Sequence, residues 1–235
     1  MKTALIAGAT GLVGQALVKE LLNRNTYEKL ILPARRETPF RNEPRVEEIV
    51  LSFDDLEDAE LYADDIYICL GTTIKKAGTK EAFEKVDYTY PLTLAKQALK
   101  QGAAQLAVIS AIGADQESNF FYSRVKGNLE ESLIMLGYPS LHILRPSLLT
   151  GPRGEFRFGE KTAEVITKPL QFAMIGPLEK YRPVHADDVA AVMHAVCQEQ
   201  SSGVHIYQSD QIRHLAEVVK EKTELLTENQ EEENQ

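Results

Sequence analysis

Short apolar runs alternate along this chain with longer stretches in which apolar residues recur at helical spacing. The runs predict buried strands, and the longer stretches predict helices with one buried face. We expect strands at residues 4–7, 30–32, 46–51, 66–70, 106–110, 141–144 and 204–207. We expect helices at residues 12–24, 79–100, 119–136, 186–198 and 210–225. This alternation is typical of an α/β fold with a doubly wound parallel sheet.

The alternation weakens after residue 150. Residues 151–183 contain eight glycine and proline residues, a density that favours loops and short helices. We therefore expect one domain over residues 1–226, in which residues 147–185 form a small, irregular C-terminal part. Residues 227–235 contain four glutamates and no apolar side chain, so we expect a disordered acidic tail there.

The composition fits a single domain and disfavours two classes of partner. The chain has 235 residues, of which 43% are hydrophobic, and this is enough for one sizeable core. Its formal net charge of -9 opposes binding to nucleic acids. No apolar stretch approaches the roughly 20 residues that span a membrane, so we expect no membrane partner either. The composition does not decide between a monomer and a homodimer.

The cysteines and histidines do not indicate a disulfide framework or a metal site. Cys69 lies in an apolar run and Cys197 in a helical stretch, so both are expected to be buried thiols. The five histidines lack the spacing of metal ligands. The chain opens on a strand rather than on a secretory signal, and we therefore expect a cytoplasmic protein.

The first strand ends in a glycine-rich turn, and a helical pattern follows it at once. In a strand–turn–helix of this kind, the first glycine permits the turn, the second lets the backbone approach a phosphate, and the third lets the helix pack closely. Unpaired N–H groups at the helix N-terminus attract the same anion. The turn predicts a Rossmann-type dinucleotide site with these contacts: Gly8, Thr10, Gly11, Leu12, Val13 and Gly14.

The residues after the second strand indicate which dinucleotide binds. Proteins of this type that prefer NAD usually place a carboxylate here, where it binds the ribose 2′-hydroxyl. This chain instead has Arg35 and Arg36, and Glu37 comes only after both. A guanidinium group suits a phosphate, which a carboxylate would repel. We therefore expect NADP(H) to be preferred over NAD(H).

Three polar residues form a candidate catalytic set. Tyr122 and Lys126 share one face of a predicted helix, and Ser110 ends the fifth strand, at the edge where parallel sheets bind ligands. A free tyrosine has a pKa of about 10, which a nearby ammonium group lowers. We expect Tyr122 to give a proton to a carbonyl oxygen as hydride arrives. Ser110 would hold that oxygen, and Lys126 would also bind the nicotinamide ribose.

These motifs together resemble the short-chain dehydrogenase/reductase superfamily, in its extended and atypical branches. The glycine turn, Ser110, residues 122–126 and residues 144–147 carry this resemblance. Further segments resemble the Tat-interacting-protein-like oxidoreductases, an atypical subgroup whose members bind NADPH. Those segments are 69–73, 76–78, 86–88, 113–115, 119–120 and 125–127.

The resemblance implies further cofactor contacts, and at one position this chain departs from the pattern of its relatives. Leu70, Gly71 and Thr72 would line the cofactor, and the segment after Pro146 would contact the nicotinamide. Relatives often have paired serines where this chain has Ser110 followed by alanine. If the second position carries the active hydroxyl, Ser110 is misassigned.

The sequence favours an NADPH-dependent oxidoreductase that reduces a small carbonyl substrate, with residues 147–185 binding that substrate. Two other functions stay open. Some atypical relatives bind the cofactor as regulatory or redox-sensing proteins with little turnover, but they commonly lose the tyrosine or lysine that this chain keeps. A nucleotide-sugar epimerase or dehydratase is the third alternative, although little chain remains after residue 150 for a nucleotide sugar.

Overall fold

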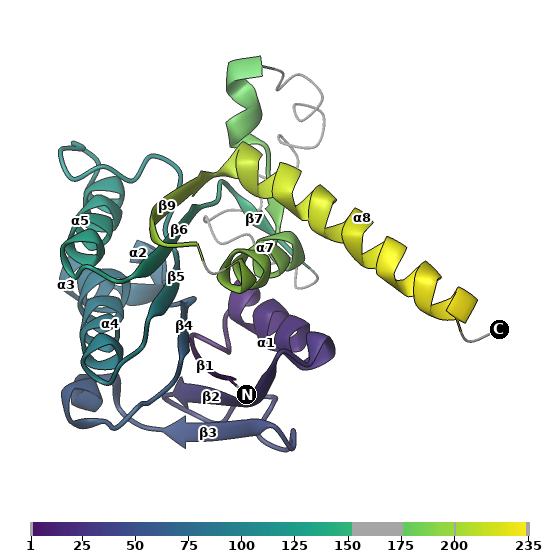
Figure 1. The fold of residues 1–235 in the computed structure, drawn as a ribbon. Helices are drawn as coiled ribbons and strands as arrows, with labels where there is room; N and C mark the ends of the chain where they lie inside the picture. The colour runs from purple at the N-terminus through teal and green to yellow at the C-terminus, as the bar shows by residue number, and fades with distance from the viewer. Residues whose placement is uncertain (1, 152–175, 200, 234–235) are drawn as a thin grey trace.

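Seven strands form one parallel sheet in the computed structural model, which describes residues 2–151, 176–199 and 201–233. The strands are β1 (Lys2–Ala7), β2 (Tyr27–Ala34), β3 (Val46–Val50), β4 (Asp65–Ile68), β5 (Gln105–Ile109), β6 (Ser140–Arg145) and β9 (Gly203–Gln208). Their order in the sheet is β3-β2-β1-β4-β5-β6-β9, and each pair is parallel (Figure 1). The strand order reverses direction between β1 and β4, so the prediction of a doubly wound, Rossmann-type sheet is confirmed.

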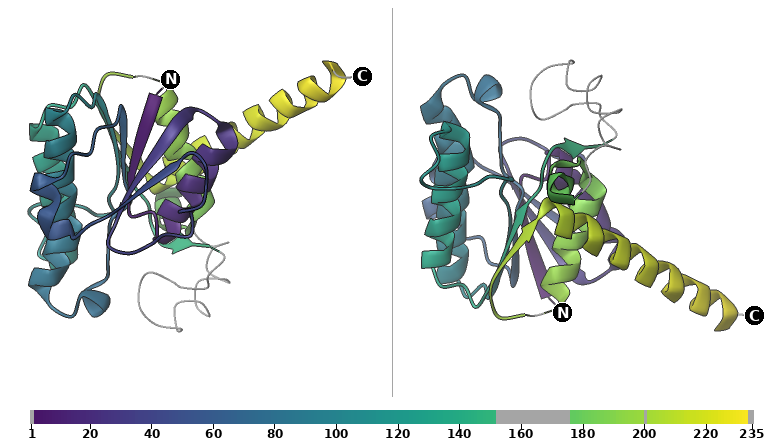
Figure 2. Two further views of the ribbon diagram at one scale, coloured as in Figure 1. Left: turned by 90° about the horizontal axis from the view of Figure 1, so that it is seen from below. Right: turned by 90° about the horizontal axis from the view of Figure 1, so that it is seen from above.

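Helices cover both faces of this sheet (Figure 2). One face carries α1 (Leu12–Arg24) and α7 (Ala186–Gln198), and α8 (Ser209–Glu233) packs on α7 before it extends away from the other elements. The other face carries α2 (Ile74–Ala77), α3 (Lys80–Glu84), α4 (Tyr90–Lys100) and α5 (Phe121–Met135).

The central strands β1, β4, β5 and β6 are buried on both faces, which explains why they are mostly apolar in the sequence, whereas the edge strands β3 and β9 are partly exposed. In β1, Ala4 and Ile6 pack in the core beneath α1 and α7. Leu5 and Ala7 pack in the second core, beneath α4 and α5. The sheet is thereby fixed from both sides, and its carboxyl edge is left as the place for a ligand.

Two elements differ from the expectation. The helix predicted at 79–100 is divided into α3, a π-helical turn at Lys85–Thr89, and α4. The prediction of a disordered tail at 227–235 is wrong for most of its length, because α8 continues to Glu233. The absence of apolar residues shows only that this segment buries little surface. Glutamate and glutamine are good helix formers, so they let the preceding helix continue.

The predicted irregular part is described at its two ends only. Close to them, β7 (Leu149–Thr150) pairs in parallel with β8 (Val184–His185), and a 3-10 turn covers Gly176–Tyr181. Residues 152–175 lie outside the described residues, so the substrate-binding role of 147–185 stays a prediction. None of the helices in the described ranges is both long and apolar enough to traverse a bilayer.

Candidate functional site

The turn after β1 is packed closely against its surroundings. Gly8 has a φ of +92°, and a Cβ atom there would lie 2.6 Å from the backbone oxygen of Cys69. A Cβ atom on Gly14 would lie 2.1 Å from the Gly8 oxygen. Gly11 precedes α1, and its N–H donates to the Gly8 oxygen at 2.8 Å. The turn therefore requires glycine at residues 8 and 14, and it directs the start of α1 toward a neighbouring cavity.

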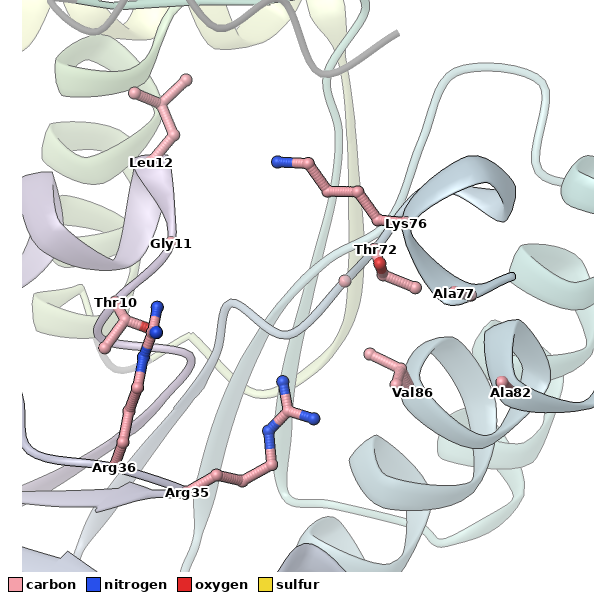
Figure 3. Close-up of a pocket in the computed structure, with 11 residues that line it drawn as sticks. Thr10, Gly11, Leu12, Arg35, Arg36, Thr72, Lys76, Ala77, Ala82 and Val86 are labelled. Atoms are coloured by element: carbon pink, nitrogen blue, oxygen red, sulfur yellow. The ribbon is translucent and has the colours of Figure 1, made fainter. Parts of the chain in front are cut away.

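This cavity has a volume of about 530 Å³ and positively charged walls (Figure 3). Thr10, Gly11 and Leu12 form one wall, and Arg35 and Arg36 extend into the cavity from the end of β2. The opposite wall consists of Gly71, Thr72, Lys76, Ala77, Ala82 and Val86. A second cavity of about 410 Å³ adjoins it and is lined by Gly8, Ala9, Thr10, Pro33, Ala34, Arg35, Arg36, Phe53 and Leu70. None of the described residues that line either cavity is acidic.

The three candidate catalytic residues meet at a smaller cavity, where β4, β5 and β6 end. It is lined by Leu70, Gly71, Thr72, Asp87, Ile109, Ser110, Ala111, Tyr122, Lys126, Pro146, Ser147 and Leu149. Gly71 and Thr72 line both this cavity and the one beside the glycine turn. The two cavities therefore adjoin at these two residues.

Val13 differs from the other predicted cofactor contacts. Its side chain is buried in the core beneath α1, and it is absent from the described residues that line the three cavities. Gly14 is absent from these linings too, because it packs against the Gly8 backbone. Any contact from Val13 must therefore come from its backbone.

Lys126 forms a buried ion pair with Asp87. Its Nζ lies 2.7 Å from Asp87 Oδ1, and the two side chains are 4% and 1% exposed. The other oxygen of Asp87 accepts the Thr72 N–H at 2.7 Å. Asp87 belongs to the π-helical turn Lys85–Thr89, and such turns often occur at functional sites. The carboxylate thus joins the Lys126 ammonium group to the backbone that follows β4.

Ser110 lies directly after β5 and donates its hydroxyl proton to Glu130 of α5. Glu130 is buried and forms an ion pair with Arg145, whose Nε lies 3.0 Å and 3.1 Å from the two carboxylate oxygens. The carboxylate beside Arg145 raises the pKa of its guanidinium group. Since an ionised carboxylate can only accept, the Ser110 hydroxyl must donate to it and keeps only acceptor capacity toward a ligand. This arrangement differs from the expectation that Ser110 donates to a substrate oxygen.

Tyr122 lies in the first turn of α5, and its half-buried ring is held by packing. The ring centroid lies 5.7 Å from that of Phe83, a fully buried residue of α3. Phe83 also packs against Phe121, at 5.7 Å. These contacts limit the movement of the phenol at the cavity that it lines.

The sequence did not single out Asp87, Glu130 or Arg145 as functional residues. Each is one charged residue in a helical or strand-end pattern, which usually indicates a solvated position. Asp87 and Arg145 stood within two of the segments that carry the resemblance, residues 86–88 and 144–147, and these segments were the available signals. In the described part of the chain, no group of three or more histidine, cysteine or acidic side chains is arranged to hold a metal ion.

Comparison with known proteins identifies relatives over most of the chain. Residues 4–209 match the NAD dependent epimerase/dehydratase family. The protein is 33% identical to "Protein FMP52, mitochondrial" of Eremothecium gossypii over 214 residues, which are 89% of this chain and 95% of that protein. It is 36% identical to "Protein HTATIP2" of Rattus norvegicus over 164 residues, which are 68% of this chain and 67% of that protein.

Similar solved structures include MoeE5 in complex with UDP-glucose and NAD. Its TM-score is 0.65 at 15% identity, and the match covers 91% of this chain and 80% of that one. A UDP-glucose 4-epimerase from Thermotoga maritima with UDP-glucose has a TM-score of 0.63 at 17% identity, over 93% and 82% of the two chains. At these identities the similarity establishes the fold alone.

The relatives also correct one prediction. The cytoplasmic location is contradicted, because the relatives from Eremothecium gossypii, Candida albicans and Lodderomyces elongisporus are named as mitochondrial proteins. The prediction rested on the lack of a secretory signal, which does not separate these two compartments. The resemblance to short-chain dehydrogenase/reductases of the Tat-interacting-protein type is confirmed. This chain therefore belongs to the NAD dependent epimerase/dehydratase family.

Proposed function

We propose that this protein is an oxidoreductase that uses NADPH to reduce the carbonyl group of a small molecule. The observation that carries the proposal is the place of Tyr122 and Lys126 in a cavity that shares Gly71 and Thr72 with the basic cavity at the glycine turn. The family and the NAD bound to similar structures support a nicotinamide dinucleotide.

The residues present fit this cofactor. The backbone at Gly8 and Gly14 is too crowded for side chains, as a turn that cradles a pyrophosphate requires. Arg35 and Arg36 offer guanidinium groups just past β2, where the ribose 2′-position lies in this fold. A phosphate there favours NADPH over NADH, because these cations would bind it and none of the described lining residues would repel it.

NADPH, when bound, supplies the hydride that adds to the carbonyl carbon. Tyr122 then donates the accompanying proton to the carbonyl oxygen and becomes a phenolate. The Lys126 ammonium group stabilises this phenolate, and Asp87 holds the ammonium in place at 2.7 Å. Solvent returns the proton to Tyr122 after the alcohol leaves. Ser110, whose hydroxyl donates a hydrogen bond to Glu130, acts as a hydrogen-bond acceptor toward the substrate in the same cavity.

The test is the replacement Tyr122→Phe, assayed with a panel of aldehydes and ketones by the oxidation of NADPH. We expect kcat with the best substrate of the wild-type protein to fall by about two to four orders of magnitude, because the replacement removes the proposed proton donor. NADPH affinity should change little. Tyr62→Phe is the matched control, because Tyr62 is 59% exposed and is not one of the described lining residues. An unchanged rate in Tyr122→Phe would disprove the proposed mechanism.

A second candidate, nucleotide-sugar epimerisation or dehydration, is favoured by the matched family and by similar structures that hold UDP-sugars. Calorimetry with UDP-glucose in the presence of NAD separates it from carbonyl reduction. Heat of binding followed by conversion of the sugar would support it. If NADPH binds but neither substrate class is turned over, a regulatory or redox-sensing role replaces both.

A further inference from the structure

Lys76 lies on a short, well-defined turn after β4. The hydroxyl oxygen of Thr73 accepts the Lys76 N–H at 3.1 Å and caps the start of α2. Gly78, with a φ of +84°, ends the helix and donates its N–H to the Ile74 oxygen at 3.0 Å. Both ends of α2 are therefore held by hydrogen bonds, and they fix the backbone position from which the long Lys76 side chain extends.

This side chain lies across the basic cavity from the glycine turn. Figure 3 shows its ammonium group extending toward Gly11 and Leu12, whereas Arg35 and Arg36 enter from the end of β2. Cations therefore converge from two walls of one cavity, in a chain whose net charge is -9. A local positive potential within an acidic protein draws small anions to that cavity.

We propose that Lys76 binds the pyrophosphate of the dinucleotide from the wall opposite the glycine turn. The proposal rests on the proposed function. The first turn of α1 offers backbone N–H groups to a phosphate, but these lie on one side only. Lys76 supplies the charge on the other side, so the pyrophosphate is held between α1 and α2. The arginines are then left for the ribose phosphate, and only they distinguish NADP(H) from NAD(H).

The test compares Lys76→Met with Lys75→Met in the full chain. Both lysines are exposed on α2, but only Lys76 is among the described residues that line the cavity, so Lys75→Met is the matched control. In calorimetry, we expect Lys76→Met to weaken NADP⁺ and NAD⁺ by the same factor, about tenfold or more, as for the loss of one charge-assisted hydrogen bond. Arg35→Met should weaken NADP⁺ selectively.

Phosphorus NMR of bound NADP⁺ gives a second readout, because the pyrophosphate and the 2′-phosphate have separate resonances. We expect Lys76→Met to move the pyrophosphate signals and to leave the 2′-phosphate signal in place. Unchanged affinity and spectra, or a loss confined to NADP⁺ with a shifted 2′-phosphate, would overturn the assignment of Lys76. If the wild-type protein binds neither coenzyme, the proposed function itself fails, which is a distinguishable result.

Discussion

At the scale of single residues, two buried carboxylates determine how the candidate catalytic groups are held. Asp87 neutralises Lys126 at 2.7 Å, and Glu130 accepts a hydrogen bond from the Ser110 hydroxyl while it pairs with Arg145. Burial of an unpaired charge lowers the stability of the fold, so Lys126 requires Asp87 and Arg145 requires Glu130. The charge that Tyr122 experiences therefore comes from a lysine–aspartate pair and not from a lone ammonium group.

Replacing Asp87 by asparagine removes the negative charge and keeps an acceptor oxygen for Lys126 and Thr72. The ammonium charge is then uncompensated and favours the phenolate of Tyr122. Because carbonyl reduction needs the protonated phenol, we expect the alkaline limb of the kcat/KM profile to move to lower pH by about one unit. Asp55→Asn, at an exposed position, is the control. An unmoved limb, with NADPH still bound, would show that Asp87 does not act on Tyr122.

Candidate site residues could be recognised from the sequence where their spacing along a helix indicated a shared face. Residues that matter because they are buried could not be recognised in this way. Tyr122 and Lys126 are recognisable because four positions on a helix bring two side chains to one face. Asp87 and Glu130 each appear as an ordinary acid in a helical stretch, where the usual environment is water. Only the packing of separate elements shows that both acids are buried, and that packing is a tertiary property.

At the scale of secondary structure, the central strands were predictable because burial on both faces favours apolar residues along the whole strand. The alternation of strands and helices indicated a doubly wound parallel sheet, whereas the order of the strands comes from the structure. The π-helical turn at Lys85–Thr89 was not predictable, because it adds one residue to a turn without a change in composition. This turn places Asp87 at the cavity that Tyr122 also lines. Asp87 was therefore missed in the sequence for the same reason as the turn.

The pairing of β6 with β9 places one histidine in a buried polar cluster. His142 is fully buried, and its two ring nitrogens lie 3.0 Å from the hydroxyls of Ser140 and Tyr207. The ring of His205 stacks on it at 5.2 Å. Burial, and secondarily the charge of His205, lower the pKa of His142 from 6.5 to about 4. The folded protein therefore holds this imidazole neutral over a range in which the unfolded chain would protonate it.

This shift predicts that acid weakens the fold through His142. Between pH 6.5 and 4 the unfolded chain binds the extra proton, so the free energy of unfolding falls as the pH falls through that window, by about 3 kcal/mol from this residue. His142→Gln keeps a donor and an acceptor but does not titrate. Denaturant titrations at several pH values should show a smaller loss of stability on acidification in this variant. Equal losses in both proteins would contradict the assignment.

At the scale of the whole molecule, the sheet brings the candidate groups that follow its strands to one edge. The glycine turn follows β1, the arginines follow β2, Thr72 follows β4, and Ser110 follows β5. These residues are far apart in the sequence and meet because the carboxyl ends of parallel strands lie on one side of the sheet. The fold thus forms the basic cavity within a chain whose net charge is -9.

The contrast between the local and the total charge predicts which anions bind. We expect a small phosphorylated ligand to bind in the basic cavity, whereas the net negative charge of the whole protein repels a nucleic-acid duplex. At a concentration of about one hundred times its Kd, NADP⁺ should add about 2.7 kcal/mol to the free energy of unfolding. For a chain of this length, we expect Tm to rise by roughly 5 to 10 °C, as measured by calorimetry. A DNA duplex at the same phosphate concentration should leave Tm unchanged. A comparable rise of Tm with DNA would mean that charge alone attracts phosphate to the surface. It would contradict the prediction that the cavity binds a specific ligand.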